Sequence, residues 1–322
     1  MIYNLGKIIG EGSDGIVYEL MTENNCNNVI KFIQGDIYGI KNYIEYFILF
    51  NLNGDYITKC EKIEIEEDGL IKLIFNKADS DLRDFLQKNK LGQKKKKYIM
   101  KRLVEGLEYL HSFNIIHGDI KPANILVFDK INVKYADFNL SRIYLDGEKI
   151  EKKLYTITYR APEILGGKAT LKSDIWALGC TFFEIYYGYE YFNFSRDKKL
   201  YHLKNSLETK EENMIFNDLI KNMIEPDENK RFSIEKIKNH EYFLKERFPS
   251  SFKKKKVMRK QEFINILKEN FSRYDILANV DQRLFLSKTV NFSCIPVHKN
   301  YKKIENKLCK ENFSLNLFKI EN

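Results

Sequence analysis

Short apolar runs separated by turn signals fill the first part of the chain and predict a β-rich region. The runs with the length of strands are Leu5–Glu11, Ile16–Leu20, Val29–Ile33, Lys62–Glu66 and Leu70–Phe75. Asp68-Gly69 favours a tight hairpin turn between the last two of these strands. Asp36 to about Leu52 instead carries apolar residues at helical spacing, which predicts a helix.

Helical spacing takes over from about residue 81. An i, i+4 apolar stripe runs through Lys95–Ser112, and further helices are expected at Ser173–Tyr187, Asn213–Ile224 and Ser233–His240. The Ser173 hydroxyl can accept a bond from a free amide of the first turn, so Ser173 is the expected N-cap. The predicted fold class is α+β, with a small β-rich lobe, a larger helical lobe and a linker near Asn76–Ser80.

Composition and charge narrow the class of protein. The 322-residue chain is 43% hydrophobic and 31% charged, which is typical of a globular protein. Its net charge of +9 suits anionic partners such as nucleotides or acidic peptides, while a basic solvated surface is a simpler explanation than a nucleic-acid site. The five cysteines are widely spaced without a CxxC pair, which favours a reducing compartment over a disulfide framework or zinc site.

No stretch resembles a signal peptide or a membrane span, so a cytoplasmic or nuclear location without a membrane partner is expected. After about Phe248 the composition changes, and the basic run Lys253–Lys256 opens a region without a readable motif. A solvated linker is the simpler explanation of this run, and a nuclear-localisation signal or an acidic partner is the alternative. Residues 249–322 are predicted to be a basic C-terminal extension whose role stays open.

A glycine-rich turn joins the first two expected strands in the pattern GxGxxGxV, from Gly10 to Val17. Glycines let the backbone approach phosphate groups without a Cβ in the way, although such turns are common in hairpins. Lys31 follows on the third expected strand, and Glu45 stands 14 residues later in the expected helix. Asp36 is expected to cap that helix, so Glu45 is the candidate partner that would direct Lys31 toward phosphates.

The strongest chemical signal is the run Ile115–Val127, which follows a long expected helix. In it Asp119 is followed by Lys121 and then by Asn124. An aspartate can orient a hydroxyl and accept its proton, a lysine can neutralise a transferring phosphoryl group, and an amide oxygen can bind Mg²⁺. Asp137 lies 13 residues after Asn124 and is a candidate second magnesium ligand. These are the parts that phosphoryl transfer needs.

In this order the segments resemble the eukaryotic protein kinase superfamily over residues 1–248. The resemblance extends to the segments Thr156–Glu163, Ser173–Gly179 and Lys230–Ser233. It implies a bilobal protein kinase fold, with an N-lobe of residues 1–78 and a C-lobe of residues 79–248, and it implies ATP and Mg²⁺ as cofactors. It also implies that Asp174 braces the catalytic loop and that Arg231 pairs with Glu163.

The resemblance assigns site residues as well. The implied catalytic residues are Asp119, Lys121, Lys31, Glu45 and Thr156. Thr156 is expected to help hold Asp119 and Lys121, and the implied magnesium ligands are Asn124 and Asp137. The implied nucleotide-binding residues are Ile9, Gly10, Glu11, Gly12, Ser13, Asp14, Gly15, Ile16, Val17, Lys31, Phe75 and Ala78.

Short motifs within these segments indicate which group of protein kinases the chain resembles. Lys121 in its His-x-Asp-x-Lys-Pro run resembles serine/threonine kinases. Tyr159–Glu163 and Phe75–Leu82 look like the cyclin-dependent and MAP kinase group, although Thr158 stands where that group has tryptophan. A protein substrate with a serine or threonine hydroxyl is therefore expected. A regulatory protein partner is compatible with the resemblance, and a nucleic-acid partner is not expected.

Two departures leave an alternative open. Gly118 replaces the arginine of His-Arg-Asp and cannot pair with a phosphate on the activation segment, and Asn139 replaces the glycine of Asp-Phe-Gly. Asparagine is the side chain that best tolerates the left-handed conformation. All directly catalytic residues are present, which favours an active kinase. The alternative is a pseudokinase that binds nucleotide as a scaffold. A small-molecule kinase is disfavoured because Thr156–Glu163 is typical of peptide docking.

Overall fold

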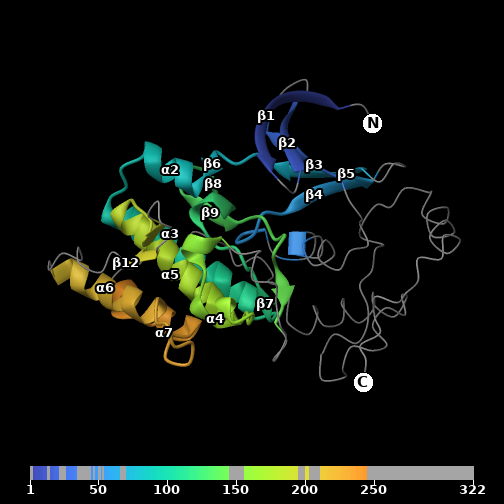
Figure 1. Cartoon of the computed structure of the whole chain (residues 1–322). Helices are drawn as coiled ribbons and strands as arrows, with labels where there is room; N and C mark the ends of the chain where they lie inside the picture. Colours follow the sequence, from blue (N-terminus) through green and yellow to red (C-terminus); the bar gives the residue numbers. More distant parts are fainter. Residues whose placement is uncertain are drawn as a thin grey trace, which may run out of the picture. The chain divides into compact units, whose positions relative to one another are not determined.

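The computed structural model describes residues 3–12, 15–21, 27–34, 45, 48–49, 52, 54–65, 70–144, 156–194, 200–202 and 211–244 (Figure 1). The chain divides into two compact units. The described parts of the first unit lie within residues 3–34 and 61–75, and those of the second lie within 45–60 and 76–244. The predicted limits of the domain, the two lobes and the extension stay predictions.

The first unit contains a sheet whose strands follow the order β1-β2-β3-β5-β4. The strands are β1 (Asn4–Gly12), β2 (Gly15–Met21), β3 (Asn28–Gln34), β4 (Cys60–Ile65) and β5 (Leu70–Asn76). All the strands expected from the sequence are present, while the turn at Asp68-Gly69 lies outside the described residues. Leu20, Ile30 and Ile74 form the buried core of this sheet.

Helices make up most of the second unit, so the predicted α+β class is confirmed. They are α2 (Leu82–Lys88), α3 (Gln93–His111), α4 (Pro162–Leu165), α5 (Leu171–Tyr187), α6 (Glu211–Met223), α7 (Ile234–Lys238) and α8 (Glu241–Leu244). The long helices α3 and α5 pack against each other, and α6 packs on α5 (Figure 1). Of the helix expected at 36–52, the described residues Glu45, Ile48 and Leu49 are helical.

The start of α5 corrects one expectation. Its N-cap is Thr170, whose hydroxyl accepts the amide of Lys172 at 3.2 Å, and the helix begins at Leu171. Ser173 lies inside the first turn and accepts the Thr170 amide at 3.1 Å, which completes a capping box. The Ser173 hydroxyl also donates to Glu163 at 2.7 Å. The sequence identified a capping residue at this end but placed the cap three positions too late.

Short strands hold the segments that connect the helices. They are β6 (Ser80–Asp81), β7 (Ile115–Ile116), β8 (Ile125–Phe128), β9 (Asn132–Tyr135), β10 (Arg142–Ile143), β11 (Phe192–Phe194) and β12 (Leu200–His202). β8 lies between β6 and β9, and β7 pairs with β10. The Tyr135 hydroxyl donates to Leu103 at 2.8 Å and ties β9 to α3. Among the described helices, none has the length and apolar character needed to cross a membrane.

Candidate active site

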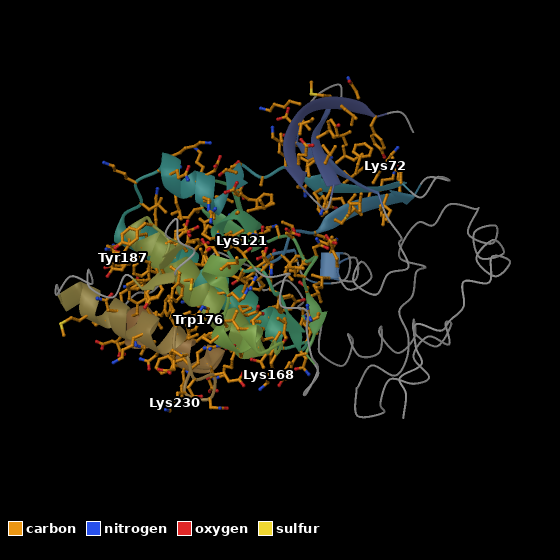
Figure 2. All side chains as sticks on the ribbon, in the orientation of Figure 1. Lys72, Lys121, Lys168, Trp176, Tyr187 and Lys230 are labelled. Carbon is orange, nitrogen blue, oxygen red and sulfur yellow. The ribbon has the colours of Figure 1, made fainter. Side chains whose placement is uncertain are left out.

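The loop between β7 and β8 carries the candidate catalytic residues. Lys121 Nζ donates to Asp119 Oδ2 at 2.6 Å and to Thr156 Oγ1 at 2.8 Å. The Thr156 hydroxyl in turn donates to Asp119 Oδ1 at 2.7 Å. Each carboxylate oxygen of Asp119 therefore accepts one hydrogen bond from these two residues, and the three side chains form a ring of hydrogen bonds (Figure 2 labels Lys121). The expected contact of Thr156 with Asp119 and Lys121 is present.

Asn124 fixes the same carboxylate from the other end of the loop. Its amide nitrogen donates to Asp119 Oδ2 at 2.7 Å and to the Asp119 backbone oxygen at 2.9 Å. The short helix η1 (Pro122–Asn124) places this side chain, and Ala136 N donates to the Asn124 carbonyl at 2.9 Å. Since the amide nitrogen is engaged with Asp119, the amide oxygen is the end that can serve a cation.

Asp174, in the first turn of α5, braces the loop as expected. Its carboxylate accepts the backbone amide of His117 at 2.8 Å and that of Gly118 at 3.0 Å. Asp174 is 2% exposed, so both bonds are shielded from water. Burial lowers the pKa of His117, so its neutral imidazole accepts the Asp119 amide at Nδ1, at 3.3 Å. The backbone amides of His117, Gly118 and Asp119 are therefore all engaged in hydrogen bonds to side chains.

Gly118 occupies a position that a side chain does not fit. Its φ is +86°, and a Cβ built there would lie 2.6 Å from the carbonyl oxygen of Leu140. Backbone from another segment therefore fills the space beside Gly118. The replacement of arginine by glycine, which the sequence marked as a departure, is matched by this local conformation.

Gly118→Ala is expected to destabilise the fold more than Gly188→Ala. Both glycines have φ +86°, but nothing lies within 4 Å of a Cβ at Gly188, so the second variant measures only the cost of the left-handed conformation, about 1–2 kcal/mol. Leu140 must move in the first variant, which adds about 1–3 kcal/mol. Urea unfolding of both variants checks this difference. Equal losses would show that Leu140 moves aside freely.

Asp137 follows β9 and takes an unusual backbone conformation, with φ at 60°. Among the described non-glycine residues with positive φ, Asn139 does not appear. The left-handed residue of this segment is therefore Asp137, whereas the sequence pointed to Asn139. Phe138 is fully buried and its ring lies 5.0 Å from that of His117.

Asp137 and Asn124 fit a magnesium ion. Asp137 Oδ1 is buried and has no hydrogen-bond partner among the described residues. A buried carboxylate oxygen without a donor is costly, and a cation would satisfy it. Groups of three or more His, Cys, Asp or Glu that could hold a metal are absent from the part of the chain that is described. A site with one carboxylate and one amide oxygen suits Mg²⁺, which keeps waters and phosphate oxygens as its other ligands.

Glu163 and Arg231 form the buried ion pair that the sequence predicted. The guanidinium donates to the two carboxylate oxygens at 2.7 and 2.9 Å. Burial alone would raise the pKa of Glu163, but the bonds from Arg231 and Ser173 outweigh it and hold that pKa below its usual value. The pair ties the segment that begins at Thr156 to the start of α5, and so supports the position of Thr156 indirectly.

The glycine-rich turn lies in the first unit. Gly12 faces Gly15 across the β1–β2 hairpin, and Ser13 and Asp14 lie outside the described residues. Gly15 has φ +128°, and a Cβ there would lie 2.0 Å from the Phe32 carbonyl oxygen. Only glycine fits at this point, because the backbone of β3 occupies the space that a side chain would need.

The other candidate nucleotide-binding residues are divided between the units. Val17 pairs with Lys31 in the β2–β3 register. Phe75 ends the described part of the first unit, and Ala78 and the helical Glu45 belong to the second. The pairing of Lys31 with Glu45 stays a prediction.

Sequence reasoning missed two residues that support the loop. His111, at the end of α3, places Nε2 at 3.1 Å from Asp174 Oδ2, and the Ser141 hydroxyl donates to the His117 carbonyl at 2.9 Å. The candidate loop residues are therefore held through a shared carboxylate and through backbone. Neither residue belongs to a spacing pattern, so no signal in the sequence distinguishes them from ordinary polar positions.

Comparison with known proteins decides the family. The protein kinase domain family matches residues 3–243. The chain belongs to the protein kinase domain family. The expected protein kinase fold and the expected resemblance to cyclin-dependent kinases are thereby confirmed. The two departures at Gly118 and Asn139 occur inside this matched kinase domain.

Relatives of this kinase domain carry related names. It is 32% identical over 201 residues to the "Probable CTD kinase subunit alpha homolog" of Encephalitozoon cuniculi, an alignment that covers 61% of each chain. It is 36% identical over 205 residues to cyclin-dependent kinase E-1 of Arabidopsis thaliana, covering 57% of this chain and 44% of the relative. It is 37% identical over 194 residues to cell division control protein 2 homolog 3 of Trypanosoma brucei brucei, covering 57% and 62%. The alignments thus span less than two thirds of these relatives' lengths.

Proposed function

We propose that this chain is a serine/threonine protein kinase that transfers the γ-phosphate of ATP to a serine or threonine hydroxyl of a protein substrate. The observation that carries the proposal is the carboxylate of Asp119, held by Lys121, Thr156 and Asn124. A carboxylate fixed on several sides can orient a hydroxyl with little reorganisation, which is the main demand of phosphoryl transfer.

In the proposed reaction each loop residue has one task. Asp119 orients the substrate hydroxyl and accepts its proton as the oxygen bonds to the γ-phosphorus and ADP leaves with the electron pair of the broken bond. Lys121, 2.6 Å from Asp119 Oδ2, is close enough to neutralise charge on the phosphoryl group as it passes. Asp137 and Asn124 would hold Mg²⁺, which would supply charge neutralisation on the phosphates.

The nucleotide-binding part of the proposal rests on the first unit. Gly12 and Gly15 face each other across the β1–β2 hairpin and carry no side chain that would block phosphates, and Lys31 of β3 pairs with Val17 of β2. We assign the remaining contacts to Ile9 through Val17, to Phe75 and to Ala78, with Glu45 as the partner of Lys31. These assignments rest on the protein kinase resemblance.

The substrate class and partners are also proposed. Relatives named as a CTD kinase subunit, a cyclin-dependent kinase and a cell division control protein support a protein substrate and a regulatory protein partner. The His-x-Asp-x-Lys-Pro run that contains Lys121 resembles serine/threonine kinases and supports serine or threonine as the acceptor. A cytoplasmic or nuclear location, without a membrane or nucleic-acid partner, completes the proposal.

The test is transfer of radiolabelled phosphate from ATP to a generic basic protein and to the chain itself, with Mg²⁺ and with a chelator. We expect magnesium-dependent label on serine or threonine after acid hydrolysis of the product. Label on tyrosine alone would overturn the acceptor assignment. A folded protein that binds Mg·ATP but transfers no phosphate would favour the pseudokinase alternative.

A further inference from the structure

A charged cluster lies next to the candidate active site in the second unit. It comprises Arg83 of α2, Tyr159 of the short helix η3 (Ile157–Tyr159), Glu184 of α5, and Glu190 beyond the end of α5. Arg83 Nη2 donates to the Tyr159 hydroxyl at 3.0 Å and to Glu190 Oε1 at 3.2 Å. The Tyr159 hydroxyl donates to Glu184 Oε2. Arg83 Nε lies 3.7 Å from Glu184 Oε1.

The cluster has two carboxylates and a single cation. The Glu184 side chain is 10% exposed, whereas Arg83 and Glu190 are 36% and 35% exposed. The Arg83 side chain therefore lies between one buried and one partly exposed carboxylate, with its Nε buried and the side chain as a whole open to solvent. Burial raises the pKa of Glu184, and the opposing effects of the Tyr159 hydrogen bond and the Arg83 charge do not fully offset it. Removal of Arg83 would leave an acidic recess open to solvent.

This recess is beside the proposed path of the substrate. Tyr159 lines a small hollow together with Asp119, Thr156 and Gly118. The Tyr159 amide donates to the Thr156 carbonyl at 3.1 Å, so one short helical turn separates the residue that holds Asp119 from the charged cluster. An extended peptide advances about 3.3 Å per residue. Side chains a few residues from the target hydroxyl would therefore come within reach of the cluster.

We propose that Arg83 fills, from within the chain, an acidic recess that would otherwise bind an arginine or lysine of the substrate. The proposal deepens the proposed function, because it concerns the substrate class of the same site. The internal guanidinium already pairs with Glu184 at 3.7 Å and donates to Glu190 at 3.2 Å, so a basic residue of the peptide gains little there. The kinase accordingly accepts substrates without selecting for basic residues near the serine or threonine.

The test compares two serine peptides that differ only in arginine or alanine at positions within three residues of the serine. With wild-type protein we expect kcat/KM for the two peptides to agree within about threefold, since exposed charge pairs contribute little. With Arg83→Ala we expect the arginine peptide to be favoured about tenfold or more, because its guanidinium would restore a cation beside Glu184, whose side chain is only 10% exposed. Guanidinium chloride at low millimolar concentration should reduce this preference by competing for the recess.

Matched variants separate recognition from folding. Arg83→Ala/Glu190→Gln removes one carboxylate and is expected to lose most of the acquired preference, and circular dichroism checks that each variant folds. Binding of both peptides is also measured by calorimetry without ATP, so that a chain without phosphate transfer still yields an answer. A wild-type protein that prefers the arginine peptide tenfold, or an Arg83→Ala protein that binds both peptides equally, would overturn the proposal.

Discussion

Asp119→Asn is expected to slow phosphate transfer about 10²–10⁴-fold, the range that a positioned general base contributes. The substituted amide keeps the shape of the side chain but cannot take the proton of the substrate hydroxyl. In the wild type Asn124 Nδ2 donates to Asp119 Oδ2 at 2.7 Å. An amide nitrogen at the Oδ2 position would place two hydrogen-bond donors against each other. Steady-state phosphate transfer at saturating Mg·ATP measures the loss.

The control for this variant is Asp218→Asn. Asp218 lies on α6 with its side chain 62% exposed, and its described side-chain contacts are with His240 and Asn222 at the surface. The same chemical change there is expected to leave turnover within about twofold, as for most surface substitutions. The unfolding curve of Asp218→Asn should agree with that of wild type to within about 1 kcal/mol, and circular dichroism checks that Asp119→Asn is folded. Full turnover of folded Asp119→Asn protein would remove Asp119 from the mechanism.

Arg231→Met is expected to lower the free energy of unfolding by about 3–5 kcal/mol, the usual cost of leaving one partner of a buried ion pair alone. Arg231 is 1% exposed, and besides Glu163 it donates to the carbonyls of Glu225 at 2.9 Å and Lys172 at 2.7 Å. Its guanidinium also stacks over the ring of Trp176, labelled in Figure 2, at 5.1 Å. Urea unfolding monitored by circular dichroism measures the loss.

A double variant and the pH dependence identify the ion pair as the cause. Glu163→Gln/Arg231→Met should lose less stability than the sum of the two single variants, because it leaves no unpaired charge. The pKa of Glu163 is lowered from its ordinary 4.5, so the pair stabilises the protein above about pH 4.5 and this contribution disappears as the pH falls through the folded value. The difference between wild type and Arg231→Met should therefore shrink on acidification. A difference independent of pH would assign the loss to packing on Trp176 instead.

Local signals in the sequence were enough to predict the strands and helices and to identify the residues of the candidate catalytic loop. Strands β1, β2 and β3 follow from short apolar runs around glycine and asparagine turns, and α3 follows from its i, i+4 stripe. Asp119, Lys121 and Asn124 lie within six consecutive residues, so the sequence alone places them in one loop. The contact between Glu163 and Arg231 came from the family resemblance, since 68 residues separate them.

Conformation at single residues depended on the packing around them. The sequence placed the N-cap of α5 at Ser173, but the Ser173 hydroxyl is engaged by Glu163 and by the Thr170 amide, so Thr170 caps the helix. The sequence showed that Asn139 could tolerate a left-handed conformation, whereas the described residue with positive φ in this segment is Asp137. At Ser173 the competing partner Glu163 belongs to another segment, which a local sequence pattern does not reveal.

The sequence by itself determined the protein kinase family and the residues of the catalytic loop, because the chemistry of phosphoryl transfer requires these residue types in a short stretch of chain. Tertiary structure alone decided how that loop is held. Asp174 reaches the His117 and Gly118 amides, Leu140 fills the space at Gly118, and Arg83 meets Glu184 only after chain segments far apart in sequence have packed. Burial and hydrogen bonding depend on which surfaces meet, and this is settled only when the chain folds.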